Sequence, residues 1–210
     1  MIEDNTDLAT LMKRISAKSP DLVEFRLDEL HDRNRLEEIT SKKSFPTIAT
    51  DRSDRDQRKK LEQLTYAASL GFDLIDLELA TTDAATVKHM KSEGAQIILS
   101  FHDFSQTPSK EHLTKILRAE KKLGGDVCKI VTTARQPHDN LTILDFVESE
   151  APKVRLISFA MGSQGVPSRV LSPLFGAEFT FASLGENLRT AEGQLSIDQL
   201  RSAWQILEIQ

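Results

Sequence analysis

The chain has 210 residues, with 27 lysines and arginines against 32 aspartates and glutamates, and a formal net charge of -5. This length suits one domain or an α/β barrel near the lower size limit, and the acidic balance argues against a nucleic-acid partner or an acidic membrane surface. One cysteine excludes an internal disulfide framework, and no Cys/His cluster has zinc spacing. The polar, acidic residues 1–5 and apolar runs no longer than a strand predict a soluble, cytoplasmic protein that does not enter a membrane.

Short runs rich in Val, Ile, Leu and Phe recur every 22 to 31 residues and predict seven strands. Helical patterns separate them; the first has Leu8, Leu11, Met12 and Ile15 at helical spacing, and another covers residues 108–123. The predicted strands cover residues 22–28, 47–52, 73–80, 95–103, 126–134, 154–161 and 178–185.

Repeated strand and helix units indicate an α/β fold with a parallel sheet, and we expect residues 1–210 to form a single (β/α)8 TIM-barrel domain. The eighth strand must precede the helix near residues 5–18, where only residues 1–4 remain. The first strand of the barrel is therefore expected to be very short or incomplete.

Lys129 lies inside the β-branched apolar run of the strand predicted over residues 126–134. Because side chains alternate along a strand, Val127, Lys129 and Val131 share one face and Cys128 and Ile130 the other, so Lys129 is expected to be buried on either face. Burial disfavours the charged form of an amine, and a neutral amine is the nucleophile that forms a Schiff base. The alternatives are an amine that reaches solvent at the strand end, or one that pairs with a carboxylate of another strand.

Further polar side chains fall at the C-terminal ends of the predicted strands, which is the end that carries active sites in such barrels. Glu24, Arg26 and Asp28 share one strand face, which is costly unless they pair with one another or with a polar ligand. Ser100 and His102 share the face of a later strand. A lone histidine is more often structural, but charged neighbours at several strand ends favour a chemical role. The other polar strand ends carry Thr50, Arg52, Asp76 and Glu78.

Two loops add candidate residues. Residues 161–169 form a glycine-punctuated loop that ends in Arg169, whose guanidinium suits a bidentate contact with a carboxylate. The alternative is an ordinary loop with a solvated arginine. The loop over residues 186–194 is longer than a simple connection needs, and such loops often close over sites.

These residues, taken in order, resemble the motifs of the type I 3-dehydroquinate dehydratases of the shikimate pathway. The resemblance covers residues 22–195, and its specificity comes from six motifs in the right order. The matching segments are Glu24-Phe25-Arg26-Leu27-Asp28, residues 48–52, Ser100-Phe101-His102-Asp103-Phe104 with Thr107-Pro108, residues 126–130, Met161-Gly162 through Ser168-Arg169, and Gly193-Gln194.

The resemblance implies that Lys129 forms an imine with the C3 ketone of 3-dehydroquinate, and that the protonated imine serves as an electron sink. His102 then removes the C2 proton and later returns one to the departing C1 hydroxyl. Arg169 holds the substrate carboxylate, aided by Thr190 and Gln194. The remaining implied contacts are Glu24, Arg26 and Arg52 on the ring hydroxyls and the carbonyl region, and Phe104 and Met161 as apolar walls. The resemblance implies no metal and no cofactor, and a homodimer.

A Schiff-base lysine shared with other enzymes, and departures from the family pattern, leave two alternatives open. The Asp56-Gln57-Arg58 segment replaces a Glu-Gly-Gly whose glutamate supports the histidine, and we expect Asp56 to take that glutamate's place. Thr190 stands where the family commonly has Ser, and Glu192 where it has Pro. The alternatives are another Schiff-base lyase, such as a class I aldolase, and a non-catalytic homologue that binds a shikimate-like acid.

Overall fold

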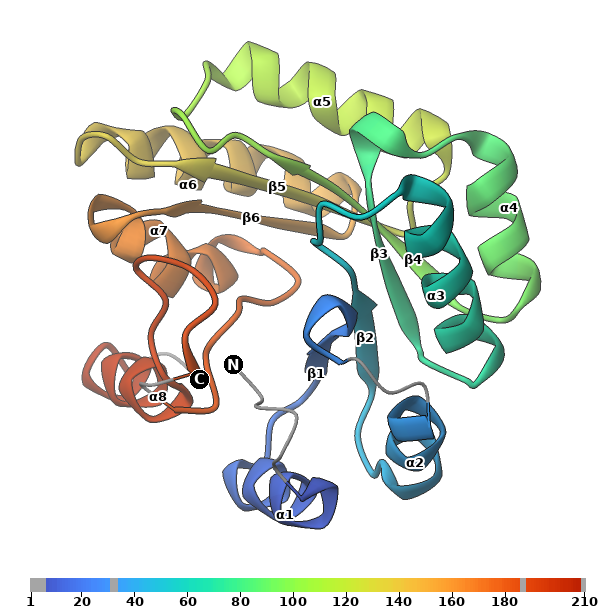
Figure 1. The fold of residues 1–210 in the computed structure, drawn as a ribbon. Helices are drawn as coiled ribbons and strands as arrows, with labels where there is room; N and C mark the ends of the chain where they lie inside the picture. The colour runs from blue at the N-terminus through green and yellow to red at the C-terminus, as the bar shows by residue number, and fades with distance from the viewer. Residues whose placement is uncertain (1–6, 31–33, 186–187, 209–210) are drawn as a thin grey trace. The chain divides into compact units, whose positions relative to one another are not determined.

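The computed structural model describes residues 7–30, 34–185 and 188–208, in which strands alternate with helices along the chain (Figure 1). Six strands, β1 to β6, follow one another in the sheet in chain order, and the pairs β1 with β2, β2 with β3 and β5 with β6 are parallel. This arrangement confirms the predicted α/β fold of the TIM-barrel type. The first strand expected over residues 1–4 lies outside the described residues.

The chain divides into two compact units, Met1–Ile98 with Leu123–Gly125, and Leu99–Lys122 with Asp126–Gln210. Strand β4 (Gln96–His102) contributes its first three residues to the first unit and the rest to the second. A single domain over residues 1–210 stays a prediction.

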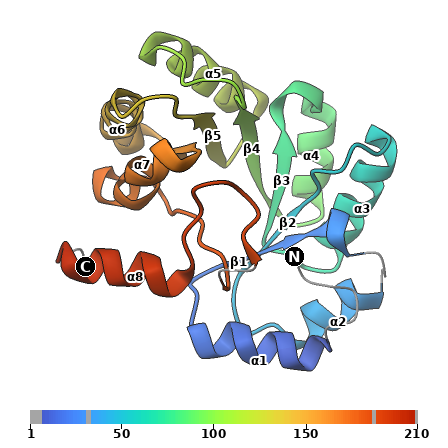
Figure 2. The same ribbon diagram turned by 60° about the vertical axis from the view of Figure 1, so that its left-hand side comes forward.

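The first unit contains three complete strand and helix repeats and an additional helix, α1, before them. Asp7 caps α1 by accepting hydrogen bonds from the amides of Ala9 and Thr10, and the predicted apolar face of that helix is buried. Helices α1 and α2 lie side by side in both Figure 1 and Figure 2. The elements are α1 (Leu8–Lys18), β1 (Val23–Arg26), η1 (Leu27–Glu29), α2 (Asn34–Lys42), β2 (Thr47–Thr50), α3 (Gln57–Ser69), β3 (Leu74–Glu78), η2 (Leu79–Thr81) and α4 (Ala84–Ser92).

The second unit is built around β5 and β6, which pair over six residues from Cys128 with Leu156 to Thr133 with Met161. Helices α6 and α7 pack on β6 and on each other, and Phe146, Val147 and Ile157 are fully buried there. The elements after β4 are α5 (Lys110–Leu123), β5 (Val127–Thr133), α6 (His138–Glu150), η3 (Ala151–Lys153), β6 (Leu156–Met161), η4 (Ser163–Gly165), α7 (Val166–Leu171), η5 (Ser172–Phe175) and α8 (Ile197–Ile206).

The prediction of a strand over residues 178–185 is wrong. In this segment only Ser183 forms a bridge, with Ser196, while the amide of Glu178 donates to the carbonyl of Leu156. Phe179 and Phe181 still contact each other with ring centroids 5.5 Å apart, as alternate residues on one side of an extended chain do. The alternation of residue types therefore predicted correctly which side chains share one side of the segment. A β-strand also needs a neighbouring strand that pairs with it continuously, and the described residues do not supply one.

Strand β1 is shorter than predicted, because it ends at Arg26 and Asp28 lies in η1. The Arg26 guanidinium donates to both carboxylate oxygens of Asp28, Nε at 2.9 Å and Nη2 at 2.6 Å. This bidentate pair turns the chain out of the strand while keeping the two charges together.

Candidate active site

In the first unit, the ends of β1 to β3 carry a cluster of paired charges. The Arg52 guanidinium donates to Asp76 at 2.7 Å and to Glu78 at 3.1 Å. Burial acts to lower the pKa of Arg52, but the two carboxylates outweigh it and raise that pKa above its ordinary value. Thr50 donates its hydroxyl to Glu24 at 2.8 Å. The predicted residues Glu24 and Arg52 therefore sit among fixed hydrogen-bond partners.

Asp28 connects Arg26 to this cluster, since one of its oxygens also accepts the Arg52 amide at 3.2 Å. Burial acts to raise the pKa of Asp28, but its hydrogen bonds with Arg26 and with the Arg52 amide outweigh it and hold that pKa below its ordinary value. Within this unit the guanidinium charges of Arg26 and Arg52 are both matched by carboxylates.

Asp56 is an exposed residue that caps α3 by accepting a hydrogen bond from the Arg58 amide at 2.9 Å. Its predicted support of the histidine stays a prediction. Asp51 was not among the predicted residues; it is a buried carboxylate that accepts hydrogen bonds from the amide and hydroxyl of Ser53. Its position directly after β2 was the available signal.

In the second unit, His102 is the last residue of β4 and is half-buried. The ring of Phe104 stacks against its imidazole, with centroids 5.8 Å apart and planes at 12°, although Phe104 is 77% exposed. The predicted base and one predicted apolar wall are therefore in contact.

Lys129 lies in the middle of β5 and is only 5% exposed, so the residue is buried as predicted. Its Nζ lies 4.4 Å from the centroid of the Phe181 ring. A ring face at this distance stabilises a positive charge on that nitrogen. Phe181 was not among the predicted residues; the alternation of Phe179 and Phe181 in the sequence was the available signal for it.

Cys128, next to Lys129, is fully buried on the opposite face of β5, as predicted from strand alternation. Burial and the neighbouring Glu120 carboxylate raise the pKa of the thiol to about 12. Cys128 is therefore a core residue without nucleophilic character at neutral pH.

Arg169, on α7, is 2% exposed, which rules out the solvated loop arginine. Its Cζ lies 4.1 Å from the centroid of the Phe159 ring, and Nη1 donates to the Phe181 carbonyl at 3.5 Å. Nε and Nη2 are buried and have no acceptor among the described residues. Burial lowers the pKa of Arg169 to about 10. A buried guanidinium with two unsatisfied donors is suited to bind an anion bidentately.

The predicted closing segment, residues 190–194, packs against the end of β6. Gln194 is buried, and its side-chain oxygen accepts the Thr190 amide at 2.8 Å. The Gly162 amide donates to the Glu192 carbonyl, and a Cβ on Gly193 would lie 2.3 Å from the Gly162 carbonyl oxygen. The two glycine motifs that are distant in the sequence are therefore in backbone contact. Residues 186 and 187 of this loop lie outside the described residues.

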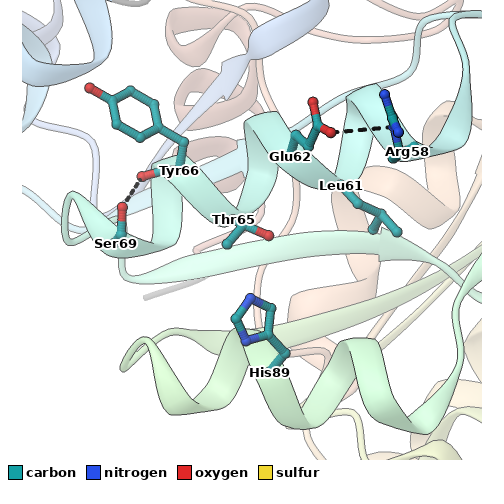
Figure 3. Close-up of a pocket in the computed structure, with 7 residues that line it drawn as sticks. All are labelled: Arg58, Leu61, Glu62, Thr65, Tyr66, Ser69 and His89. Carbon is teal, nitrogen blue, oxygen red and sulfur yellow. Dashed lines mark hydrogen bonds and ion pairs between the residues drawn. The ribbon is translucent and has the colours of Figure 1, made fainter.

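The remaining features do not involve the predicted site residues. A shallow hollow between α3 and α4, in the first unit, is lined by residues such as Leu61, Tyr66 and His89 (Figure 3). In the described part of the chain, no three His, Cys, Asp or Glu side chains are grouped to hold a metal ion. Likewise, none of its helices has the length and apolarity that crossing a membrane requires.

Comparisons with known proteins agree over the whole chain. The family model for type I 3-dehydroquinase matches residues 1–210. A 3-dehydroquinate dehydratase of Dehalococcoides mccartyi is 33% identical over 84% of this chain and 82% of its own length, and that of Methanocaldococcus jannaschii is 31% identical over 100% and 97%. The crystal structure of the Geobacillus kaustophilus 3-dehydroquinate dehydratase superposes with a TM-score of 0.87 at 27% identity, covering 98% of this chain and 88% of that one.

Proposed function

Because the chain belongs to the type I 3-dehydroquinase family, we propose that it removes water from 3-dehydroquinate to give 3-dehydroshikimate in the shikimate pathway. It is an enzyme of the hydro-lyase class. At the level of atoms, the proposal rests on the buried Arg169, whose Nε and Nη2 donors have no acceptor among the described residues. The substrate carboxylate supplies the two acceptors that this guanidinium requires.

Lys129 is the nucleophile in the proposed mechanism. Its amine attacks the C3 carbonyl, the carbonyl oxygen leaves as water, and a protonated imine forms. The strand fixes the lysine backbone, and the Phe181 ring face 4.4 Å from Nζ stabilises the positive charge of the imine. That positive charge acidifies the adjacent C2 hydrogen.

His102 is the general base and then the general acid. It takes the C2 proton, and the electron pair of that C–H bond moves into the imine to give an enamine. As the electron pair returns, the C1–O bond breaks and the hydroxyl leaves as water with the proton from His102. Hydrolysis of the imine then releases 3-dehydroshikimate and restores the Lys129 amine, so one water is lost overall.

The other roles rest on the resemblance to the family. Gln194 and Thr190 assist Arg169 at the carboxylate, and their mutual hydrogen bond at 2.8 Å supports this pairing. Phe104 and Met161 form apolar walls. Glu24, Arg26 and Arg52 orient ring hydroxyls and the carbonyl region, and Asp56 supports His102 in place of the family's glutamate.

Borohydride reduction in the presence of 3-dehydroquinate tests the function. We expect a covalent mass increase located on Lys129 by peptide mapping, together with the enone absorbance of the product. Enone formation without the mass increase would refute the imine mechanism. Reaction with other ketones or aldehydes alone would favour an aldolase, and binding without turnover a non-catalytic homologue.

Two variants separate the nucleophile from the base. Lys129→Ala is expected to abolish the borohydride-trapped adduct and turnover. His102→Ala is expected to retain an adduct that forms slowly and does not eliminate water. Turnover unchanged in both variants would contradict both assignments.

We further propose that the protein is cytoplasmic, as its apolar runs of no more than strand length predict, and that it is a homodimer, as the resemblance implies. Light scattering coupled to size exclusion is expected to give a mass of about twice that of the chain, and a monomer mass at micromolar concentration would refute the dimer.

A further inference from the structure

The loop that follows His102 is attached to the end of the lysine strand by hydrogen bonds of both main chain and side chains. The Asp103 amide donates to the Val131 carbonyl at 2.9 Å, and the Asp103 carbonyl accepts the Thr133 hydroxyl at 2.9 Å. Both partners belong to β5, two and four residues after Lys129. The peptide groups on both sides of Asp103 are thus held by the strand that carries the nucleophile.

The rest of the loop is attached to Thr132 and Thr133 of the same strand. The Thr107 hydroxyl donates to the Thr133 carbonyl at 3.0 Å and lies 2.9 Å from the hydroxyl of Thr132. One hydroxyl has a single proton, so Thr132 is the donor of that second bond. The Thr133 amide donates to the Gln106 carbonyl at 3.2 Å.

Inside the loop, the Asp103 carboxylate fixes the turn itself. One of its oxygens accepts the amide and the hydroxyl of Ser105, at 2.8 and 2.6 Å, and the Gln106 amide at 3.0 Å. Phe104, which stacks on His102, lies between these anchored residues. An exposed ring gains little from burial, so its place against the imidazole depends on how firmly its neighbours are held.

We propose that Thr133 is a positioning residue for the general base: its hydroxyl, by holding the Asp103 carbonyl, fixes the direction of His102 and the Phe104 ring relative to Lys129. This inference rests on the proposed dehydratase function. Proton transfer is sensitive to placement at the level of an ångström, so loss of one such bond acts on the C2 proton step rather than on imine formation.

The test compares Thr133→Val with Thr133→Ser, which keeps the hydroxyl, and with Thr114→Val as a matched control. Thr114 also donates to a carbonyl at 2.9 Å, that of Lys110, but within helix α5. We expect Thr133→Val to lower kcat by about tenfold or more, with KM within about twofold, and Thr133→Ser and Thr114→Val to resemble the wild type.

Two readouts separate positioning from mere destabilisation. The fraction of enzyme trapped by borohydride during turnover should rise in Thr133→Val, and the isotope effect with substrate deuterated at C2 should increase, because proton removal has become slower than imine formation. A destabilised variant would lose kcat without changing either quantity. Thr133→Ala repeats the measurement if the valine variant does not fold.

The outcomes distinguish this inference from the proposed function. A wild-type protein that does not turn over 3-dehydroquinate contradicts the proposed function. An active wild type with Thr133→Val at full kcat, or with lower kcat and an unchanged trapped fraction and isotope effect, overturns the positioning role alone.

Discussion

Two arginines, the half-buried Arg52 in the first unit and the buried Arg169 in the second, show opposite ways of accommodating the same charge. Arg52 donates to the carboxylates of Asp76 and Glu78, which raise its pKa despite burial. Arg169 faces the Phe159 ring, and burial lowers its pKa to about 10. Carboxylates of its own unit neutralise the Arg52 guanidinium, whereas Arg169 has two donors without an acceptor among the described residues, and we propose that the substrate carboxylate neutralises it.

The two arginines are therefore expected to differ in what each contributes to folding stability. A guanidinium with its carboxylates in place adds order to the strand ends but gains little from a new anion. A buried guanidinium with unsatisfied donors costs stability, and an anion that satisfies them recovers that cost.

The largest expected effect is on the paired arginine. Arg52→Met leaves the fully buried Asp76 side chain and Glu78 without their main counter-charge, so we expect a loss of about 3 kcal/mol in the free energy of unfolding. Urea denaturation at pH 7 measures it. An unchanged free energy of unfolding would show that the carboxylates do not depend on Arg52.

Arg169→Met is expected to have the opposite profile. The free energy of unfolding should rise by about 1 kcal/mol or more, because the variant no longer buries a guanidinium whose donors lack an acceptor among the described residues. KM for 3-dehydroquinate should rise about a hundredfold, as expected for loss of a charge-assisted bidentate contact worth about 3 kcal/mol. Steady-state kinetics measures this, and an unchanged KM would remove Arg169 from the carboxylate site.

Gly193→Ala tests the segment that we propose to close over the site together with Arg169. The φ of Gly193 is 75°, and a Cβ there would lie 2.3 Å from the Gly162 carbonyl oxygen. We expect the alanine to destabilise the packed conformation of this segment by about 2 kcal/mol. The segment then detaches from Gly162, and KM rises. Gly185→Ala is the matched control, since its Cβ would meet no atom of the described residues within 4 Å. Equal KM values for the two variants would contradict the close packing.

The smallest expected effect is on the free energy of unfolding at acidic pH. The pKa of Asp28 is lower in the folded chain than its ordinary value, so the unfolded chain binds more protons as the pH falls. The Arg26–Asp28 pair therefore stabilises the folded chain above about pH 4, and this stabilisation is lost as the pH falls through the folded pKa of Asp28. For a partly exposed pair we expect the loss to be about 1 kcal/mol. Arg26→Met should flatten the dependence of the free energy of unfolding on pH in this range. The same slope in both proteins would exclude the pair as its source.

Sequence patterns predicted what depends on local periodicity. The six strands β1 to β6 and the helix over Leu8–Lys18 were found, and the burial of Lys129 followed from alternation. The sequence pattern could not show that residues 178–185 lack a strand to pair with, because strand pairing depends on a segment distant in the sequence. It also could not find Phe181, whose role depends on lying near Lys129 in space. The burial of Arg169 was likewise a tertiary effect, since an arginine after a loop is exposed in most sequences.

The inert thiol of Cys128 has a practical consequence. With the only cysteine of the chain fully buried and its thiol pKa near 12, maleimide and iodoacetamide reagents meet no reactive background sulfur. A cysteine introduced at an exposed position would be modified alone. Fluorophores or spin labels can thus report distances in this chain without first removing a native residue.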